Sequence, residues 1–173
     1  MNIKWDADKY TKDFSLESEY TKFSPFELEN IKGTIVENKI TVTRDIEDTK
    51  YLPLKSTRLE VVAPKVNGKN PIEVDVLASK LMATRGEDTG NTVFEPKNWK
   101  YDQTNGLINV YVENENNIYS KGSDEYVIIY RYEDYINEEN SNLSNKVKAT
   151  VTEYSGEQNN TLTKEINNSQ DIQ

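Results

Sequence analysis

The sequence predicts an all-β fold, an antiparallel β-sandwich with one short helix near the N-terminal third. Three observations lead to this prediction. Apolar and polar residues alternate through most of the 173 residues, turn-forming residues separate the alternating runs, and no segment shows the apolar periodicity of a helix of ordinary length. Because no long helix is available to cover a parallel sheet, the strands should pair antiparallel.

The N-terminal third is expected to hold a strand and then the helix. In DFSLESEYTKF, Leu16 and Tyr20 lie among polar residues at an even spacing, which indicates a strand. The following FSPFELENIKG offers Ser24 as N-cap, Pro25 at the first helical position and a glycine beyond the end. These signals predict a helix of one or two turns over residues 25–32.

Five further runs alternate with period two: GTIVENKITVTR, STRLEVVAP, PIEVDVLA, DEYVIIYRYEDY and NKVKATVTEY. Each has its apolar residues on one face and its polar residues on the other, as expected for strands half buried in a sandwich. The last two runs should be long central strands. The apolar sets are Val36, Ile40 and Val42; Leu59, Val61 and Ala63; Ile72, Val74, Val76 and Ala78; Tyr126, Ile128, Tyr130 and Tyr132; and Val147, Ala149 and Val151.

A hairpin is predicted in NWKYDQTNGLINVYVEN. Its centre, Asn105-Gly106, is the preferred pair for a two-residue turn in which both residues have positive φ. The turn should pair a short strand that holds Trp99 and Tyr101 with a longer strand that holds Ile108, Val110 and Val112.

The domain organisation follows from these runs. Residues 1–32 form an N-terminal strand and helix segment packed on the main domain, and residues 33–153 form the β-sandwich domain. Residues 154–173 are polar and are predicted to be a tail or linker. The opening MNIKWDADKY lacks the basic and apolar regions of a secretory signal. Either the protein stays inside the cell or the sequence is a domain excised from a larger protein, and we favour the excised domain.

Composition narrows the possible chemistry. The chain has no cysteine, so it has no disulfide and no thiol nucleophile. It also has no histidine, so no imidazole can act as a general base or as a metal ligand. No glycine-rich phosphate loop, nucleophile elbow or zinc motif is present. The one carboxylate pair that leads into an apolar strand is Asp124 and Glu125. We therefore expect no enzymatic activity, no catalytic residues and no required cofactor.

The charge of the chain excludes two classes of partner. The 21 basic and 30 acidic residues give a net charge of −9, and residues 101–173 hold 5 of the basic and 13 of the acidic residues. Such a surface repels phosphates, so nucleic acids and anionic membranes are not expected partners. No run approaches the roughly 18 apolar residues of a membrane span, so we expect no membrane insertion.

Three segments together carry a resemblance to a known class of protein. LEVVAPKVNGKNPIEVDVLA, the FEPKNWKYDQTNGLINVYVEN hairpin and DEYVIIYRYEDY resemble the tandem Ig-like β-sandwich modules of large stalk and adhesin proteins on Gram-positive bacteria. The resemblance covers residues 30–153 and rests on core patterning and turns. It implies a structural or adhesive module, a spacer or stalk, at the cell surface or secreted, monomeric and adjoining other modules of the same chain.

Some such modules contain an isopeptide bond between lysine and asparagine, promoted by a buried carboxylate. The resemblance therefore raises the question of a crosslink in this chain. The candidates Lys39, Asp75, Asn109 and Lys148 all fall on the polar face of their own strands. We expect no crosslink, because the reaction requires all of its side chains in the core.

Calcium is the one metal for which the sequence offers candidates. In RGEDTGN, the side chains of Glu87, Asp88 and Asn91 supply the oxygen ligands that calcium prefers, and the NENN stretch supplies similar groups. Neither stretch has the spacing of a calcium loop, so solvated turns are the simpler interpretation and calcium the alternative.

Ligand binding on the same sandwich is a second hypothesis. The chain has 20 asparagines and 11 tyrosines, which suit a surface that binds a glycan or an extracellular protein, with Trp99, Tyr101 and Tyr111 as candidates. The same aromatic residues suit strand packing equally well. A binding module needs these rings exposed, whereas a spacer does not. A third hypothesis is a phage or virion surface domain, which obligate trimerisation would distinguish.

Overall fold

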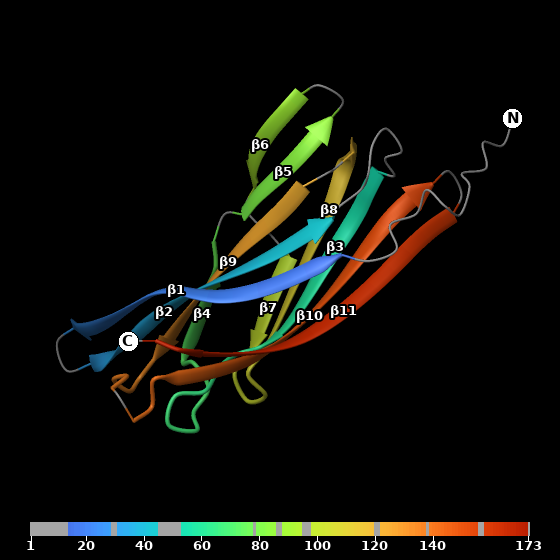
Figure 1. Cartoon of the computed structure of the whole chain (residues 1–173). Coiled ribbons are helices and arrows are strands. Elements are labelled where there is room, and N and C mark those ends of the chain that lie inside the picture. Colours follow the sequence, from blue (N-terminus) through green and yellow to red (C-terminus); the bar gives the residue numbers. More distant parts are fainter. Residues whose placement is uncertain are drawn as a thin grey trace, which may run out of the picture.

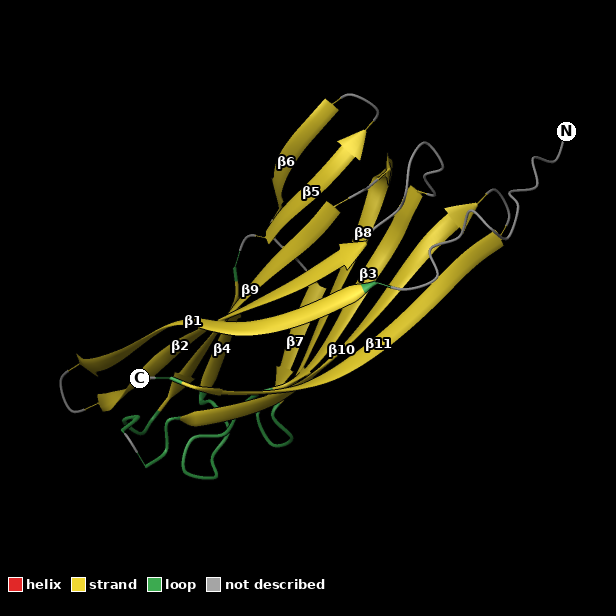
Figure 2. Cartoon of the chain, viewed as in Figure 1, coloured by secondary structure: helices red, strands yellow, loops and turns green. Residues whose placement is uncertain are grey.

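The structure is a computed structural model that describes residues 14–28, 31–44, 53–77, 79–85, 88–94, 98–119, 122–137, 139–155 and 158–172. These residues form eleven strands in two antiparallel sheets that pack as a sandwich (Figure 1). The described part of the chain contains strands, turns and loops without a helix (Figure 2). The prediction of an all-β antiparallel sandwich is confirmed. No described helix is long and apolar enough to cross a membrane.

We name the two layers sheet A and sheet B. Sheet A has the order β1-β2-β9-β5-β6, with β4 also paired to β9, and sheet B has the order β11-β10-β3-β8-β7. The strands of sheet A are β1 (Ser15–Leu28), β2 (Ile31–Arg44), β4 (Glu73–Val76), β5 (Ser79–Arg85), β6 (Asp88–Phe94) and β9 (Gly122–Tyr132). The strands of sheet B are β3 (Pro53–Val62), β7 (Asn98–Asp102), β8 (Leu107–Tyr119), β10 (Asn142–Ser155) and β11 (Gln158–Asp171).

The core lies between the two sheets and is filled by the alternating apolar residues. Each such aliphatic side chain contributes about 1.5–3 kcal/mol when it is fully buried, so this layer supplies much of the stability. The predicted faces of the central strands are confirmed. Sheet A contributes Val36, Ile40, Val42, Tyr126, Ile128, Tyr130 and Tyr132, and sheet B contributes Leu59, Val61, Ile108, Val110, Val147, Ala149 and Val151.

The helix predicted over residues 25–32 is wrong. Within this segment β1 continues to Leu28 and β2 begins at Ile31, and the two strands pair antiparallel. Cross-strand pairing overrides the capping signals, because a helix of one or two turns gains little from its own hydrogen bonds. Pro25 is tolerated since β1 is the edge strand of sheet A, where a missing N–H costs least.

The polar tail predicted from residue 154 is also wrong in its secondary structure. Residues 158–171 form β11, which pairs with β10 along its full length. The strand is polar because it is the edge of sheet B and exposes one face to solvent. Its other face packs Leu162 and Ile166 against the core, and the following Ile172 is buried.

The hairpin between β7 and β8 has the predicted pairing but a different turn. Trp99 lies opposite Val110 and Tyr101 opposite Ile108. The connection is a four-residue loop between Asp102 and Leu107 rather than a two-residue turn. Of the predicted pair, only Gly106 has a positive φ, of 67°.

Two tyrosines hold the segment that crosses from β3 in sheet B to β4 in sheet A. The hydroxyl of Tyr132 in β9 donates to the carbonyl of Pro64 at 2.5 Å, and the hydroxyl of Tyr101 in β7 donates to the carbonyl of Pro71 at 2.6 Å. The two donors come from opposite sheets. The crossing segment is therefore attached to both layers of the sandwich near each of its ends.

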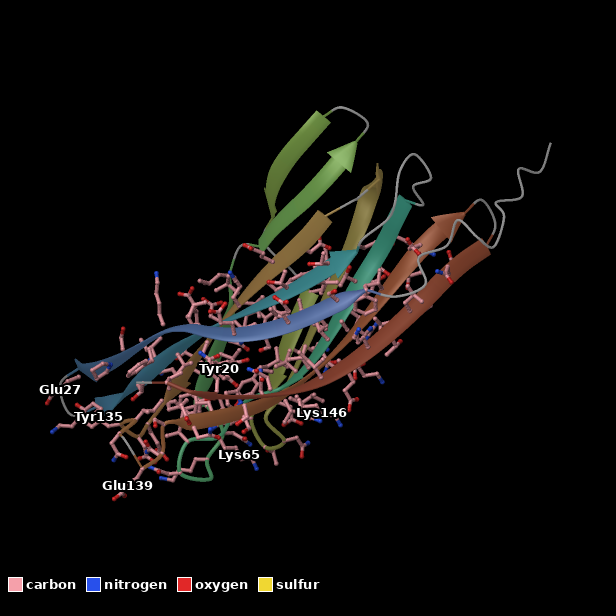
Figure 3. The ribbon with its side chains drawn as sticks, viewed as in Figure 1. Tyr20, Glu27, Lys65, Tyr135, Glu139 and Lys146 are labelled. Atoms are coloured by element: carbon pink, nitrogen blue, oxygen red, sulfur yellow. The ribbon has the colours of Figure 1, made fainter. Side chains whose placement is uncertain are left out.

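The first and last strands lie side by side where the edges of the two sheets meet (Figure 1). Contacts join Phe14 to Lys164 and, six residues further along both strands, Tyr20 to Gln170. The two strands therefore run in the same direction. Tyr20 lies beneath β1 in Figure 3, where the two edges approach.

Candidate ligand-binding face

The three aromatic residues predicted to bind ligand do not lie on one face. Trp99 and Tyr101 lie on the inner face of β7, where both are half buried against the core. Tyr111 lies on the outer face of β8, between the inward-facing Val110 and Val112. The structure therefore separates Tyr111 from the other two rings, which close the end of the core.

Tyr101 contributes to the fold through its burial and its hydrogen bond. Burial, with a smaller contribution from the charge of Asp102, raises the pKa of Tyr101 to about 12. Its hydroxyl is used by the bond to Pro71 described above. In the adjoining loop, the side chain and N–H of Asn105 donate to Asp102 and lower the pKa of its carboxyl group. This end of the hairpin is ordered by its own contacts.

A hollow of about 320 Å³ lies on the outer face of sheet B beside Tyr111. Two neighbouring rows of outward residues surround it. The first row runs from Arg58 through Tyr111 to Asn98, and the second contains Asn109 and Lys100. The main-chain neighbours Trp99 and Val110 complete the lining.

Arg58 and Tyr111 form the centre of this hollow. The guanidinium carbon of Arg58 lies 5.2 Å from the centroid of the Tyr111 ring, within the range of a cation–π interaction. Such a contact stabilises one position of a long side chain that is otherwise mobile in solvent. The sequence shows that both residues alternate outward, but the β3–β8 register that joins them was not predictable from either strand alone.

A second hollow, of about 280 Å³, lies near the end of β3 on the same sheet. Its outward side chains include Ser144, Lys146 and Ser169. Lys146, which is labelled in Figure 3, already makes an ion pair with Glu165 at 3.1 Å. The cation of this hollow is thus partly neutralised, unlike those of the hollow beside Tyr111.

A polar network lies between the sheets and binds them to each other. The side-chain oxygen of Asn38 accepts hydrogen bonds from the Tyr130 hydroxyl at 2.8 Å and from the Asn145 amide at 3.2 Å. Its amide donates to Ser18 at 2.9 Å. Burial raises the pKa of Tyr130 well above its usual value, so the phenol stays neutral. These groups stabilise the sandwich and are closed to a ligand.

The carboxylate pair Asp124 and Glu125 cannot act as one site. Successive residues of a strand point to opposite faces, and Asp124 is buried whereas Glu125 lies on the outer face. Glu125 forms an ion pair with Lys39 at 3.9 Å. The two carboxylates therefore face opposite sides of sheet A and do not face one substrate as an acid and a base would.

The other predicted positions lie as follows. Asp75 is exposed, and Lys39, Asn109 and Lys148 are half buried on the outer faces of their strands, as the alternation predicted. Glu87 lies outside the described residues. Asp88 and Asn91 lie in β6, of which the structure describes the backbone alone. Within the described residues, no three acidic side chains gather in a way that could hold a metal ion.

The sequence matches no protein-family model and no curated protein. The solved structures it resembles include pilin and adhesin domains of Gram-positive bacteria. The full-length major pilin SpaD of Corynebacterium diphtheriae matches at 10% identity with a TM-score of 0.49, over 90% of this chain and 35% of that one. The C-terminal domain of the AgI/II polypeptide BspA of Streptococcus agalactiae matches at 10% identity with a TM-score of 0.46, over 88% and 49%.

A third similar structure is the collagen-binding domain of a Staphylococcus aureus adhesin. It matches at 13% identity with a TM-score of 0.39, over 86% of this chain and 95% of that one. This chain spans 35%, 51% and 49% of the first three matched structures. At these identities and TM-scores the likeness carries no functional argument, and the proposals below rest on residues of this chain.

Proposed function

We propose that this protein is a non-catalytic structural and adhesive module of a bacterial surface protein, a spacer or stalk domain. The observation that carries the proposal is the parallel course of β1 and β11. The described chain enters the sandwich at one end of its long strands and leaves at the other (Figure 1). Such an arrangement suits a module that transmits tension between neighbours.

The strands that would bear this tension are long. β1 and β11 have 14 residues each, which corresponds to about 45 Å at about 3.3 Å per residue. A pull on Phe14 and Ile172 acts along the strands in opposite directions. It loads the β1–β2 and β10–β11 ladders in shear, so that their hydrogen bonds must break together rather than one after another.

Side-chain contacts also join the two loaded strands directly. Gln170 in β11 exchanges two hydrogen bonds with the main chain of Tyr20, and the ammonium group of Lys164 donates to the carbonyl of Phe14 at 3.0 Å. These contacts cross from one sheet edge to the other. They resist the sliding of β1 past β11 that a pull would cause.

Single-molecule force spectroscopy tests this proposal, with the full chain held between marker domains. We expect a single high-force unfolding event, which Gln170→Ala lowers and the matched exposed control Gln103→Ala leaves unchanged. Unfolding at a low force, or an equal force for both variants, would contradict a load-bearing role. Hydrolysis of a polysaccharide or peptide that is lost on replacing Asp124 or Glu125 would contradict the proposal that the module is non-catalytic.

Ligand binding on the same sandwich is a second candidate function. The hollow at Tyr111 favours it, because two cations, two amides and an aromatic ring gather there on an otherwise open sheet face. Screening against glycans and extracellular matrix proteins tests it. Saturable binding that Tyr111→Ala abolishes would support a binding module, whereas no binding across the panel would leave the spacer alone.

A further inference from the structure

We infer that the hollow beside Tyr111 binds a carboxylate-bearing glycan, with Arg58 and Lys100 holding the carboxylate. The inference rests on the second proposed function, ligand binding, and names its ligand class. It depends on three properties of the hollow: its charge, the fixed position of Arg58 and the hydrogen-bonding groups around it.

The charge of the hollow is opposite to that of the protein. The chain carries a net charge of −9, yet the residues that line the hollow include two cations and no acidic side chain. Elsewhere in the described residues, several cations are paired with carboxylates: Lys32 with Glu27, Lys39 with Glu125, Lys69 with Glu133 and Asp134, Arg131 with Glu73, and Lys146 with Glu165.

Arg58 and Lys100 differ from those cations. Neither makes an ion pair with any described residue of the chain. Three carboxylates lie beside the hollow on the same face without lining it: Glu60 opposite Asn109, Asp102 two residues beyond Lys100, and Glu113 two residues beyond Tyr111. The two cations therefore remain available to an anionic group, and these carboxylates limit how much negative charge the surface accepts.

The position of Arg58 suits a carboxylate. Its contact with the Tyr111 ring at 5.2 Å reduces the freedom of the side chain before any ligand arrives. A guanidinium group offers planar paired N–H donors that match the two oxygens of a carboxylate. Less conformational entropy is then lost on binding than for an arginine that is free in solvent.

The remaining groups suit a sugar. Asn98 and Asn109 each supply an amide that can both donate to and accept from a hydroxyl group. The volume of about 320 Å³ is at the small end of ligand sites, which suits one or two sugar rings of a longer chain.

An acidic protein partner fits this surface less well. Tight protein interfaces centre on aromatic or aliphatic anchors buried in pockets. Here the one outward aromatic ring, that of Tyr111, is already in contact with Arg58. The other outward side chains of the lining are charged or amides, so no second outward apolar side chain joins that ring.

The charge also selects among acidic glycans. Two local cations on a protein of net charge −9 favour a glycan whose carboxylates are widely spaced over one with dense sulfation, since every further anion meets repulsion. Binding should weaken with added salt, because exposed charges are screened over about 10 Å at 0.1 M salt.

Titration calorimetry of the full chain with a hyaluronan oligosaccharide tests the inference. We expect saturable binding that Arg58→Gln weakens roughly tenfold or more, since a charge-assisted hydrogen-bonded pair is lost. Arg58→Lys should weaken it as well, because the planar donor pair is lost while the charge stays. Glu60→Gln should strengthen binding, and Lys65→Gln, an exposed lysine in the crossing segment, should leave it unchanged. Equal urea midpoints among the variants exclude unfolding as the cause.

Three comparison ligands separate the ways in which the inference can fail. Equal binding of an uncharged chitin oligosaccharide, or tighter binding of heparin or poly-glutamate, would overturn the carboxylated glycan and leave ligand binding in place. An absence of binding by all of these glycans and by matrix proteins would overturn the binding function itself. Hyaluronan binding that Arg58→Gln leaves unchanged would place the site elsewhere and overturn the assignment.

Discussion

The side-chain amide of Gln170 in β11 makes two hydrogen bonds to the main chain of Tyr20 in β1, as the main chain of a neighbouring strand would. The Tyr20 N–H donates to Gln170 Oε1 at 2.9 Å, and Gln170 Nε2 donates to the Tyr20 carbonyl at 3.1 Å. One amide thus satisfies both polar groups of a main-chain residue on the edge of the other sheet. The contact closes one side of the sandwich without a backbone ladder.

Gln170→Ala should lower the free energy of unfolding by about 1–3 kcal/mol, because it leaves both main-chain groups of Tyr20 without a protein partner. Gln170→Glu should also destabilise the protein, since a carboxylate accepts from the Tyr20 N–H but repels its carbonyl oxygen. Urea unfolding followed by circular dichroism measures both changes. The exposed Gln103→Ala serves as the control, and a midpoint for Gln170→Ala equal to the control would contradict the role of this contact.

Gly106→Ala should destabilise the protein more than Gly68→Ala. Both glycines have positive φ, of 67° and 74°, so each substitution costs roughly 1–3 kcal/mol of backbone strain. A Cβ at Gly106 would also lie 2.6 Å from Asn70 Oδ1, whereas one at Gly68 meets open space. Asn70 cannot move freely, because its amide donates to the Gln103 carbonyl at 2.9 Å.

A double-mutant cycle measures this steric contribution. Asn70→Ala should relieve part of the extra cost of Gly106→Ala and none of the cost of Gly68→Ala. Urea midpoints of the two single glycine variants and of each combination supply the data. Equal costs for Gly106→Ala and Gly68→Ala would show that strain alone matters and that Asn70 gives way.

The intact mass of the purified chain should equal that of its sequence. The crosslink candidates lie outside the core and on both sheets: Lys39 and Asp75 on the outer face of sheet A, Asn109 and Lys148 on that of sheet B. Asn109 and Lys148 therefore lie on a different sheet from the carboxylate of Asp75, and these candidates do not meet in a buried environment. Mass spectrometry decides the matter, because a deficit of one ammonia or one water would reveal an internal isopeptide bond.

The alternation of apolar and polar residues was sufficient to predict strands and their buried faces, as for Val36 and Ile128, because this pattern is contained in the sequence of each strand. The predictions were wrong where pairing with a neighbouring strand determines the secondary structure. Pro25 lies in a strand because β2 pairs with it, and residues 158–171 pair with β10 although their sequence is polar. Edge strands need few apolar residues, so their pattern resembles that of a linker.

The candidate site shows the same limit. Tyr111 was predictable as an outward residue from the alternation of its own strand, and its neighbours Trp99 and Tyr101 belong to the opposite face of the sheet. The contact between Tyr111 and Arg58 depends on the register of β3 with β8. A register between strands that are distant in sequence has no local signal, so the hollow could not be predicted.

The stability of the protein should be nearly constant between about pH 6 and 9, because the chain has no histidine to titrate there, and should fall above about pH 10. Burial raises the pKa of Tyr101 to about 12 and raises the pKa values of Tyr20, Tyr130 and Tyr132 as well. Above the ordinary tyrosine pKa of about 10, the unfolded chain loses phenolic protons that the folded chain keeps. The unfolded state is then favoured increasingly as the pH rises.

Urea midpoints measured from neutral pH to about pH 11.5 check this dependence, with Tyr101→Phe as the matched variant. At neutral pH the variant should be less stable by about 1 kcal/mol, since the hydrogen bond to the Pro71 carbonyl is lost. Above about pH 10 its midpoint should fall less steeply than that of the unmodified chain, because one phenol with a raised pKa is gone. A midpoint that stays constant to about pH 11 in the unmodified chain would mean that the buried phenols ionise as readily in the folded state as in water.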